Sequence, residues 1–261
     1  MGSIIVQIYE IQTPADAEKL IEIGVDRIGS VVLSQASWKS LPIRETIKVS
    51  VPTKSQSSLI LLFSDPDTVF RALDYYQPDI VHFCEALGYH RRNCSSMVAL
   101  QKNIQVRFPE TKIMRTIPIP QTGMAERAPL IELARIFEPR SDYFLTDTVL
   151  VKSAADDPGQ QPVSGFIGIT GQTCDWDAAK SLVEASSKPV ILAGGISPDN
   201  VAYGIQQVKP AGVDSCSGTN MVDATGRPIR FKKDFSKVKR LVSKVRQAER
   251  ALSISAPATR H

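Results

Sequence analysis

The sequence has few residues of the kinds that build metal centres, disulfide frameworks or membrane spans. Its 261 residues include four cysteines and three histidines, and no two cysteines form a CxxC pair. This spacing disfavours a zinc site and a disulfide scaffold, so we expect reduced thiols, a cytoplasmic location and no metal or other cofactor. No apolar run reaches the roughly 18 residues that a membrane span needs, so we expect no membrane partner.

The chain also carries little net charge. Lysine and arginine number 31 against 27 aspartates and glutamates, which gives a formal net charge of +4. The basic residues from Arg227 onward are interpreted as the solvated face of a final helix, because no nucleic-acid-binding motif accompanies them, and we expect no nucleic-acid partner. The length suits one domain, expected over residues 1–252 as a monomer or homodimer, with a disordered tail over residues 253–261.

Short runs of β-branched residues alternate with helical patterns along the chain. Eight strands are predicted, over Ile4–Tyr9, Arg27–Leu33, Ser58–Phe63, Ile80–Cys84, Lys112–Ile117, Tyr143–Thr146, Pro189–Ala193 and Gly212–Ser215. Helices are predicted over Pro14–Ile23, Pro66–Tyr75, Ala128–Phe137, Asp175–Ala185 and Phe235–Ala251, and the segment Pro42–Ser57 is a weak helix at best. Such alternation is typical of parallel β/α units, and eight of them predict an α/β fold, the (β/α)8 TIM barrel.

Two predicted strand ends late in the chain run into small residues. Glycine and serine let backbone N–H groups approach an anion closely, and a helix start that follows adds a favourable dipole. Barrels of this class build a phosphate site after their seventh and eighth strands. We therefore predict binding of a sugar phosphate by Gly194, Gly195, Ser217, Gly218 and Thr219, with Thr170 and Gly171 as a third phosphate contact or as part of a lid.

Several stretches resemble, in order, the motifs of one enzyme family. The stretch LAGGISPDNV over Leu192–Val201 is similar to L-A-G-G-L-x-P-x-N-V, and FLTDT over Phe144–Thr148 is similar to F-L-L-D-T. Further matches are Thr13–Ala17, Gly24–Gly29, Gly168–Trp176 and Asp214–Gly218. The family that these motifs resemble is phosphoribosylanthranilate isomerase, a barrel enzyme of tryptophan biosynthesis, and the resemblance runs from about Val6 to Arg246.

This resemblance implies an Amadori rearrangement, in which an aminoaldose phosphate opens its ring and passes through an enolamine to a ketose. The reaction needs a general acid at the ring oxygen and a general base at C2. The family's acid corresponds to Asp147, whose other interpretation is a helix cap or a partner of Arg115. The family's base, the Cys of K-I-C-G, corresponds to Tyr9. Tyrosine is bulkier than cysteine and has a pKa of about 10 against about 8.5, so the ordinary activity is not expected.

The sequence leaves the second proton-transfer group open between Tyr9, Glu10, His82 and Glu85. Tyr9 is interpreted first as a bulky plug or stacking platform, and only second as a base. Glu10 or Glu85 replaces the base if it points into the barrel, and Tyr9 and Glu10 cannot both do so on a regular strand. His82 shares one strand face with Cys84, which is interpreted as a small buried hydrophobe.

Two basic residues are candidates for binding an anionic group of the substrate. Arg115 ends the fifth predicted strand and either holds a substrate anion or pairs with Asp147. Lys39, in Ser37-Trp38-Lys39, corresponds to the Arg of the S-P-R motif that holds the anthranilate carboxylate in the family. Lysine pairs an anion without the bidentate fork of arginine.

The function expected from these observations is acid–base chemistry, as isomerase or lyase, on a small phosphorylated sugar or phosphoribosyl-type substrate. Two alternatives remain open: a paralogue that binds a phosphate ligand without turnover, and a true phosphoribosylanthranilate isomerase with an exchanged base. The long segment over Val149–Thr173 is interpreted as a lid over the site.

Overall fold

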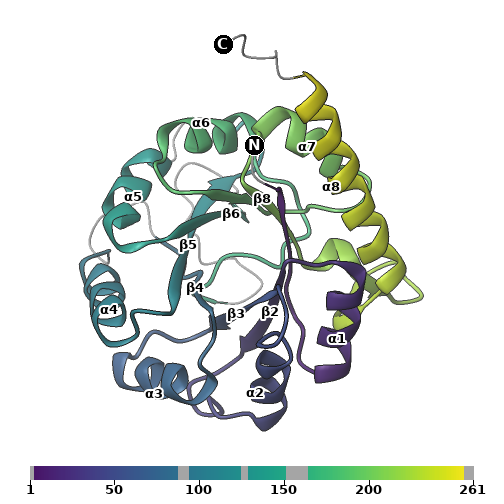
Figure 1. Ribbon diagram of the computed structural model, residues 1–261. Helices are drawn as coiled ribbons and strands as arrows, with labels where there is room; N and C mark the ends of the chain where they lie inside the picture. The colour runs from purple at the N-terminus through teal and green to yellow at the C-terminus, as the bar shows by residue number, and fades with distance from the viewer. Residues whose placement is uncertain (1–2, 88–93, 125–128, 151–163, 256–261) are drawn as a thin grey trace, which may run out of the picture.

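Eight parallel strands close into a barrel with helices around its outside (Figure 1). The computed structural model describes residues 3–87, 94–124, 129–150 and 164–255. The barrel strands are β1 Ile5–Ile8, β2 Arg27–Val32, β3 Gln56–Leu61, β4 Ile80–Phe83, β5 Lys112–Pro120, β6 Tyr143–Val149, β7 Val190–Leu192 and β8 Gly212–Ser215. Each strand pairs with the next, and β8 pairs with β1. The predicted (β/α)8 barrel is confirmed.

The helices follow the strands and cover the outer face of the barrel. They are α1 Pro14–Ile23, α2 Leu41–Lys48, α3 Pro66–Tyr76, α4 Cys94–Arg107, α5 Leu130–Phe137, α6 Trp176–Ala185, α7 Val201–Val208 and α8 Phe235–Ser255. Thr13, Asp65 and Asp175 cap α1, α3 and α6, each accepting a hydrogen bond from a backbone N–H in the first turn. Among the described residues, no helix combines the length and the apolar character that crossing a membrane requires.

Several elements differ from the sequence predictions. The helix within Pro42–Ser57 exists but is short, because α2 ends at Lys48 and residues 49–54 form turns. Helix α8 runs through Ser255, so residues 253–255 are helical instead of belonging to a tail, and residues 256–261 lie outside the described residues. A hairpin of β9 Asn220–Val222 and β10 Pro228–Lys233, absent from the prediction, follows the short 3-10 helix η5 Ser217–Thr219.

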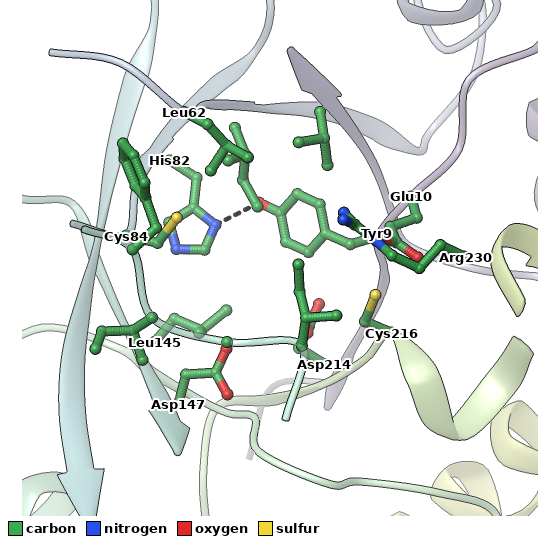
Figure 2. Close-up of a pocket in the computed structure, with 16 residues that line it drawn as sticks. Tyr9, Glu10, Leu62, His82, Cys84, Leu145, Asp147, Asp214, Cys216 and Arg230 are labelled. Carbon is green, nitrogen blue, oxygen red and sulfur yellow. Dashed lines mark hydrogen bonds and ion pairs between the residues drawn. The ribbon is translucent and has the colours of Figure 1, made fainter. Parts of the chain in front are cut away.

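Side chains alternate along each barrel strand, so one set points into the barrel and the other toward the helices. Inside, Ile80, Met114, Leu145 and Ile191 pack against one another. Toward the carboxyl ends of the strands the inward positions become polar, and Figure 2 shows Tyr9, His82, Asp147 and Asp214 gathered there. The barrel therefore presents its polar interior at the end where enzymes of this fold carry their sites.

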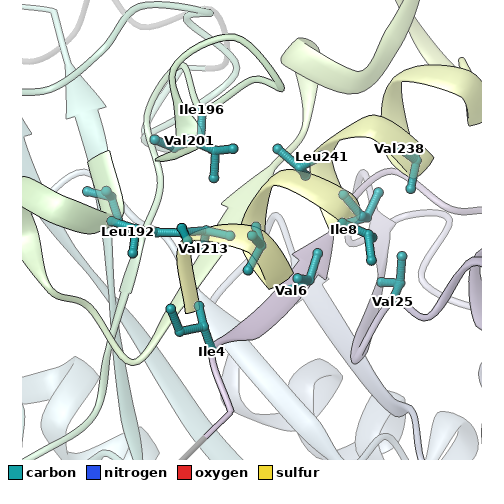
Figure 3. Packing of buried hydrophobic residues seen from close by; sticks show 14 of the residues in the cluster. Ile4, Val6, Ile8, Val25, Leu192, Ile196, Val201, Val213, Val238 and Leu241 are labelled. Carbon is teal, nitrogen blue, oxygen red and sulfur yellow. The ribbon is translucent and has the colours of Figure 1, made fainter. Parts of the chain in front are cut away.

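The largest hydrophobic cluster lies between the barrel and helices α1, α6, α7 and α8 (Figure 3). Val6 and Ile8 of β1 pack there with Val213 of β8, and Val238 and Leu241 of α8 belong to the same cluster. The first strand, the last strand and the last helix thus share one core, which holds the barrel closed.

Candidate active site

A small hollow lies at the ends of β7 and β8, where the sequence predicts the phosphate site. Its lining comprises Asp147, Ile169, Thr170, Gly171, Gly194, Gly195, Ile196, Asp214, Cys216, Ser217 and Gly218. Six of the seven predicted phosphate-binding residues are therefore brought together. Thr219 is not, because its side chain is fully buried and its hydroxyl donates to the Cys216 carbonyl at 3.0 Å.

Glycine is required in this hollow for steric reasons. Gly194 and Gly195 have φ of 87° and 62°, a region that side-chain-bearing residues rarely occupy. A Cβ on Gly195 would lie 2.6 Å from the backbone of Gln172 and Thr173, and one on Gly218 would overlap the Ile196 carbonyl. Because the loops after β6, β7 and β8 pack backbone to backbone, the hollow offers main-chain groups to a ligand.

The hollow adjoins a larger pocket inside the mouth of the barrel, and Figure 2 shows residues that line this pocket. Both are lined by Asp147, Ile169, Asp214 and Cys216. Asp147 lies on β6 and Asp214 on β8, so two carboxyl groups from nearby strands stand where the hollow and the pocket meet. This shared wall joins the glycine-walled hollow to the pocket that Tyr9 and His82 also line.

Both carboxyl groups have pKa values raised to about 7. Burial raises the pKa of Asp147, and a hydrogen bond of 2.7 Å from the Thr148 N–H opposes part of that rise. Burial and then the charge of Asp147 raise the pKa of Asp214, while a hydrogen bond of 3.0 Å from the Gln7 amide lowers it. Near neutral pH each group therefore exchanges a proton readily, which suits general acid–base catalysis.

Tyr9 occupies the interior of the barrel as the plug that the sequence predicts. Its hydroxyl lies 2.5 Å from Ser58 Oγ and 2.8 Å from His82 Nδ1, and His82 Nε2 lies 2.8 Å from Thr116 Oγ1. Burial raises the pKa of Tyr9 well above 10 and, with the charge of Arg115, lowers that of His82 to about 3. Both side chains line the pocket, yet both are held neutral and hydrogen-bonded to each other.

Glu10 lies beyond the end of β1, which changes the expectation drawn from strand alternation. Its φ of 67° turns the backbone, so Tyr9 and Glu10 both line the pocket. Glu10 is 2% exposed and accepts a hydrogen bond of 2.6 Å from Nε of Arg230, a residue of β10. Although burial raises its pKa, the hydrogen bond and charge of Arg230 lower it further, so Glu10 is an ionised partner of Arg230.

Glu85 and Arg115 lie outside the pocket, contrary to the roles predicted for them. Both are buried between the barrel and the helices, where Arg115 Nη1 forms an ion pair with Glu85 and its Nε donates to Gln101 at 2.9 Å. The Arg115 guanidinium also lies 4.6 Å from the centre of the Phe137 ring. Because their side chains point away from the barrel interior, neither residue reaches a substrate or pairs with Asp147.

Lys39 also lies away from the site that the resemblance implies for it. Its side chain is exposed, and its Nζ stands 5.1 Å from the centre of the Tyr75 ring. Neither the hollow nor the pocket includes it. The basic residue that does line the pocket is Arg230.

The loop after β6 is docked across the mouth of the barrel over its described part. The Ala86 N–H donates to the Gly165 carbonyl and the Ile167 N–H to the Cys84 carbonyl, each at 2.8 Å. This places Phe166 in the wall of the pocket. Residues 151–163 of the predicted lid lie outside the described residues.

Asp214 and Arg230 are the site residues that sequence reasoning missed. Asp214 belongs to a motif interpreted only for its small residues, although its place at a strand end was visible. Arg230 was interpreted, with the other basic residues from Arg227 onward, as part of the solvated face of the final helix. That interpretation is wrong for Arg230, because it lies on β10 of a hairpin that was not predicted. Within the described residues, no group of three or more His, Cys, Asp or Glu side chains is placed to hold a metal ion.

Comparison with known proteins shows which proteins this chain is similar to. Residues 142–244 match the family model of N-(5'phosphoribosyl)anthranilate (PRA) isomerase. The N-(5'-phosphoribosyl)anthranilate isomerase of Methanocella arvoryzae is 29% identical over 243 residues, covering 92% of this chain and 97% of that protein. Over nearly its whole length the chain is thus similar to phosphoribosylanthranilate isomerases. The enzyme of that name from Methanothrix thermoacetophila is also 29% identical, covering 94% of this chain and 99% of its own.

Solved structures of this family share the fold. A phosphoribosylanthranilate isomerase from Thermotoga maritima, crystallised as monomers of a dimeric enzyme, has a TM-score of 0.64 at 20% identity, covering 94% of this chain and 99% of its own. A thiamine phosphate pyrophosphorylase from Pyrococcus furiosus has a TM-score of 0.58 at 13% identity, covering 94% and 96%. Since the barrel serves both enzymes, the fold alone does not select the reaction.

Proposed function

We propose that this chain is an isomerase of a phosphoribosyl-type substrate in which Asp147 and Asp214 transfer the protons. The observation that carries the proposal is that both carboxyl groups line the glycine-walled hollow as well as the pocket beside it. The phosphate would be held by main-chain groups around Gly194, Gly195 and Gly218. The sugar would then extend past both carboxyl groups into the pocket.

The two carboxyl groups divide the chemistry by protonation state. Protonated Asp147 donates to the ring oxygen as the bond between that oxygen and C1 breaks. Ionised Asp214 takes the proton from C2, which gives the enolamine. The ketose forms when the C2 hydroxyl loses its proton and C1 gains one. Asp214 thereby takes the role of base, because the hydroxyl of Tyr9 stays neutral and is engaged by Ser58 and His82.

Tyr9 narrows the range of substrates. Its ring and its partners fill the interior of the barrel below the pocket, so we expect slower turnover of phosphoribosylanthranilate than by a family member with cysteine at this position. A smaller or differently shaped group on the phosphoribosyl unit would then be the better substrate.

The first test is turnover of phosphoribosylanthranilate, followed as loss of its fluorescence, with Asp147→Asn and Asp214→Asn as variants. Loss of a positioned acid or base lowers kcat by about 10²- to 10⁴-fold, and we expect the loss of kcat in each variant to lie in this range. Asp199→Asn is the matched control, because Asp199 is an exposed partner of Arg240 on the surface. If the Asp147→Asn and Asp214→Asn variants both turned the substrate over at the wild-type rate, the proposed roles would be contradicted.

The second candidate function is binding of a phosphate ligand without turnover. The neutral, fully hydrogen-bonded Tyr9 and His82 favour it, because neither supplies an ionised base. A protein that ribose 5-phosphate stabilises against heat, but that converts no phosphoribosyl substrate, would support this function in place of the isomerase.

A further inference from the structure

A row of three polar side chains crosses the interior of the barrel at Asp214. Gln7 of β1 is in register with Asp214 of β8 on one side and with Arg27 of β2 on the other. Residues in register on neighbouring strands point to the same face of a sheet, so all three side chains point into the barrel. Gln7 is fully buried, Arg27 is 2% exposed and Asp214 is 7% exposed. The amide of Gln7 therefore stands between a guanidinium and a carboxyl group.

The NH2 group of this amide binds the carboxyl of Asp214. Gln7 Nε2 donates to Oδ1 of Asp214 at 3.0 Å and also lies 3.9 Å from Sδ of Met114, which is a weak acceptor. Among the residues that the structure describes, no other group donates a hydrogen bond to this carboxyl. Since Asp214 lies in the wall of the pocket, the contact assigns Oδ1 to the protein and leaves Oδ2 for a ligand.

Arg27 favours this orientation of the amide. Its guanidinium is fixed by a hydrogen bond of 3.2 Å from Nε to Gln56 Oε1 and by the ring of Tyr143, whose centre lies 4.0 Å away. Arg27 Nη1 and Gln7 Oε1 are both buried and have no hydrogen-bond partner within the described part of the chain. An amide oxygen is attracted to a positive charge, so the electrostatic energy is lowest with Oε1 on the side of Arg27 and the NH2 group on the side of Asp214.

The charged groups that face Asp214 act on it in opposite directions. Burial raises the pKa of Asp214 and the hydrogen bond from Gln7 lowers it, and then the charge of Asp147 raises it and that of Lys233 lowers it. Two groups that burial keeps neutral, by raising the pKa of each, complete the surroundings: the Tyr9 hydroxyl and the Cys216 thiol. Gln7 is therefore the strongest of the influences that favour the ionised carboxylate.

We propose that Gln7, oriented by Arg27, is the positioning residue of Asp214: it binds Oδ1 and leaves Oδ2 to take the proton from the substrate. The proposal rests on the isomerase function above and deepens it. The bond that breaks is the C2–H bond of the substrate, its electron pair enters the enolamine, and the proton goes to Oδ2. Gln7 neither gains nor loses a proton, because its N–H still reaches Oδ1 after the transfer.

The test follows the Asp214 carboxyl directly, by NMR of protein labelled at its aspartate carboxyl carbons and titrated over pH. Asp214→Asn identifies the resonance. Gln7→Met keeps the length of the side chain without a donor, and Gln7→Glu offers Arg27 a charge partner while placing a like charge beside Asp214. Gln101→Met is the matched control, because Gln101 is a fully buried, hydrogen-bonded glutamine of α4 that lines neither the hollow nor the pocket.

We expect Gln7→Met to lower the acid dissociation constant of Asp214 by about tenfold or more, because a hydrogen bond to the charged form is lost. Gln7→Glu should lower it further, through repulsion between like charges. The acid limb of the pH profile of kcat/KM should move with this constant. Gln101→Met should leave both unchanged.

If Asp214 titrated alike in the wild type and in the Gln7 variants, or if Gln101→Met changed its titration equally, the role of Gln7 would be overturned and the isomerase proposal would stand. One Gln7 variant suffices if the other fails to fold, since both must change the titration in the same direction. A titration that moves as expected in a protein that converts no phosphoribosyl substrate would overturn the isomerase function, and the positioning of a base with it.

Discussion

Tyr9 and Gly29 depend on each other inside the barrel. A Cβ at Gly29 would overlap the Cδ1, Cε1 and Cγ atoms of the Tyr9 ring, so the ring lies directly on the backbone of β2. The ring cannot move aside freely, because its hydroxyl is held by Ser58 and His82. The absence of a side chain at one residue thus makes room for the large side chain of another.

Replacing Gly29 by alanine should therefore destabilise the wild type much more than a Tyr9→Ala variant. Forcing a methyl group into the filled site costs about 1–3 kcal/mol, and in the Tyr9→Ala background that clash is gone. Urea unfolding of the four proteins gives the coupling energy, which we expect to be at least about 1 kcal/mol. Equal costs in the two backgrounds would show that the ring does not press on Gly29.

At the scale of elements, the hairpin of β9 and β10 depends on one buried lysine. Burial lowers the pKa of Lys233 from its ordinary value, while the charges of neighbouring groups, including Glu10 and Asp214, raise it in part. Its two hydrogen bonds join β10 to the end of β8 and to the start of β9. These hydrogen bonds therefore help to hold in place the strand that carries Arg230.

Lys233→Met should lower the free energy of unfolding by about 1–3 kcal/mol, because the Cys216 carbonyl and the Asn220 side chain lose a buried donor. Lys232→Met is the control, since Lys232 is exposed and next in sequence, and we expect it to stay within about 0.5 kcal/mol of the wild type. Urea denaturation measures both. Similar losses in the two variants would mean that the buried hydrogen bonds of Lys233 are not what holds the hairpin.

Prediction from sequence succeeded where local patterns decide the structure. The strand ends at Gly194 and Ser217 were predicted to lie together, because parallel strands bring their carboxyl ends to one side of a barrel. The place of Asp147 at the site followed from the same rule. Lys39 was assigned by its position in a motif, and Arg230 only to the solvated face of a final helix. Arg230 reaches the pocket through its hydrogen bond to Glu10, a residue 220 positions away, and no local pattern encodes that pairing.

At the scale of the whole molecule, buried titratable groups set how stability depends on pH. The pKa values of Asp147 and Asp214 are about 7 in the folded protein and 3.8 as the ordinary value, so the folded state binds more protons between these limits. Their contribution is present below about pH 4 and is lost as the pH rises through 7. His82, with its pKa lowered to about 3 from 6.5, acts oppositely, and its contribution is lost as the pH falls through that window.

The double variant Asp147→Asn with Asp214→Asn should be more stable than the wild type at pH 8.5. Removing each buried charge should raise the free energy of unfolding at pH 8.5 by about 1–2 kcal/mol. The difference in stability between variant and wild type should shrink toward pH 4, where both wild-type groups are protonated. Thermal unfolding across this range measures the effect. A difference that is the same at pH 4 and pH 8.5 would contradict ionisation of these buried groups as its cause.

The two ends of the chain close the barrel. Ile5 of β1 is in register with Gly212 of β8, and Arg246 of α8 donates to the Ile4 carbonyl at 2.6 Å and pairs with Asp26 at 2.7 Å. During synthesis on the ribosome, β1 cannot pair with β8 until most of the chain has left the exit tunnel. The hydrogen bond between Glu10 and Arg230 can form only after that. A nascent chain released before that point would carry Asp147, the acid proposed above, without a closed barrel around it. We therefore expect chains truncated by interrupted translation to lack the proposed activity.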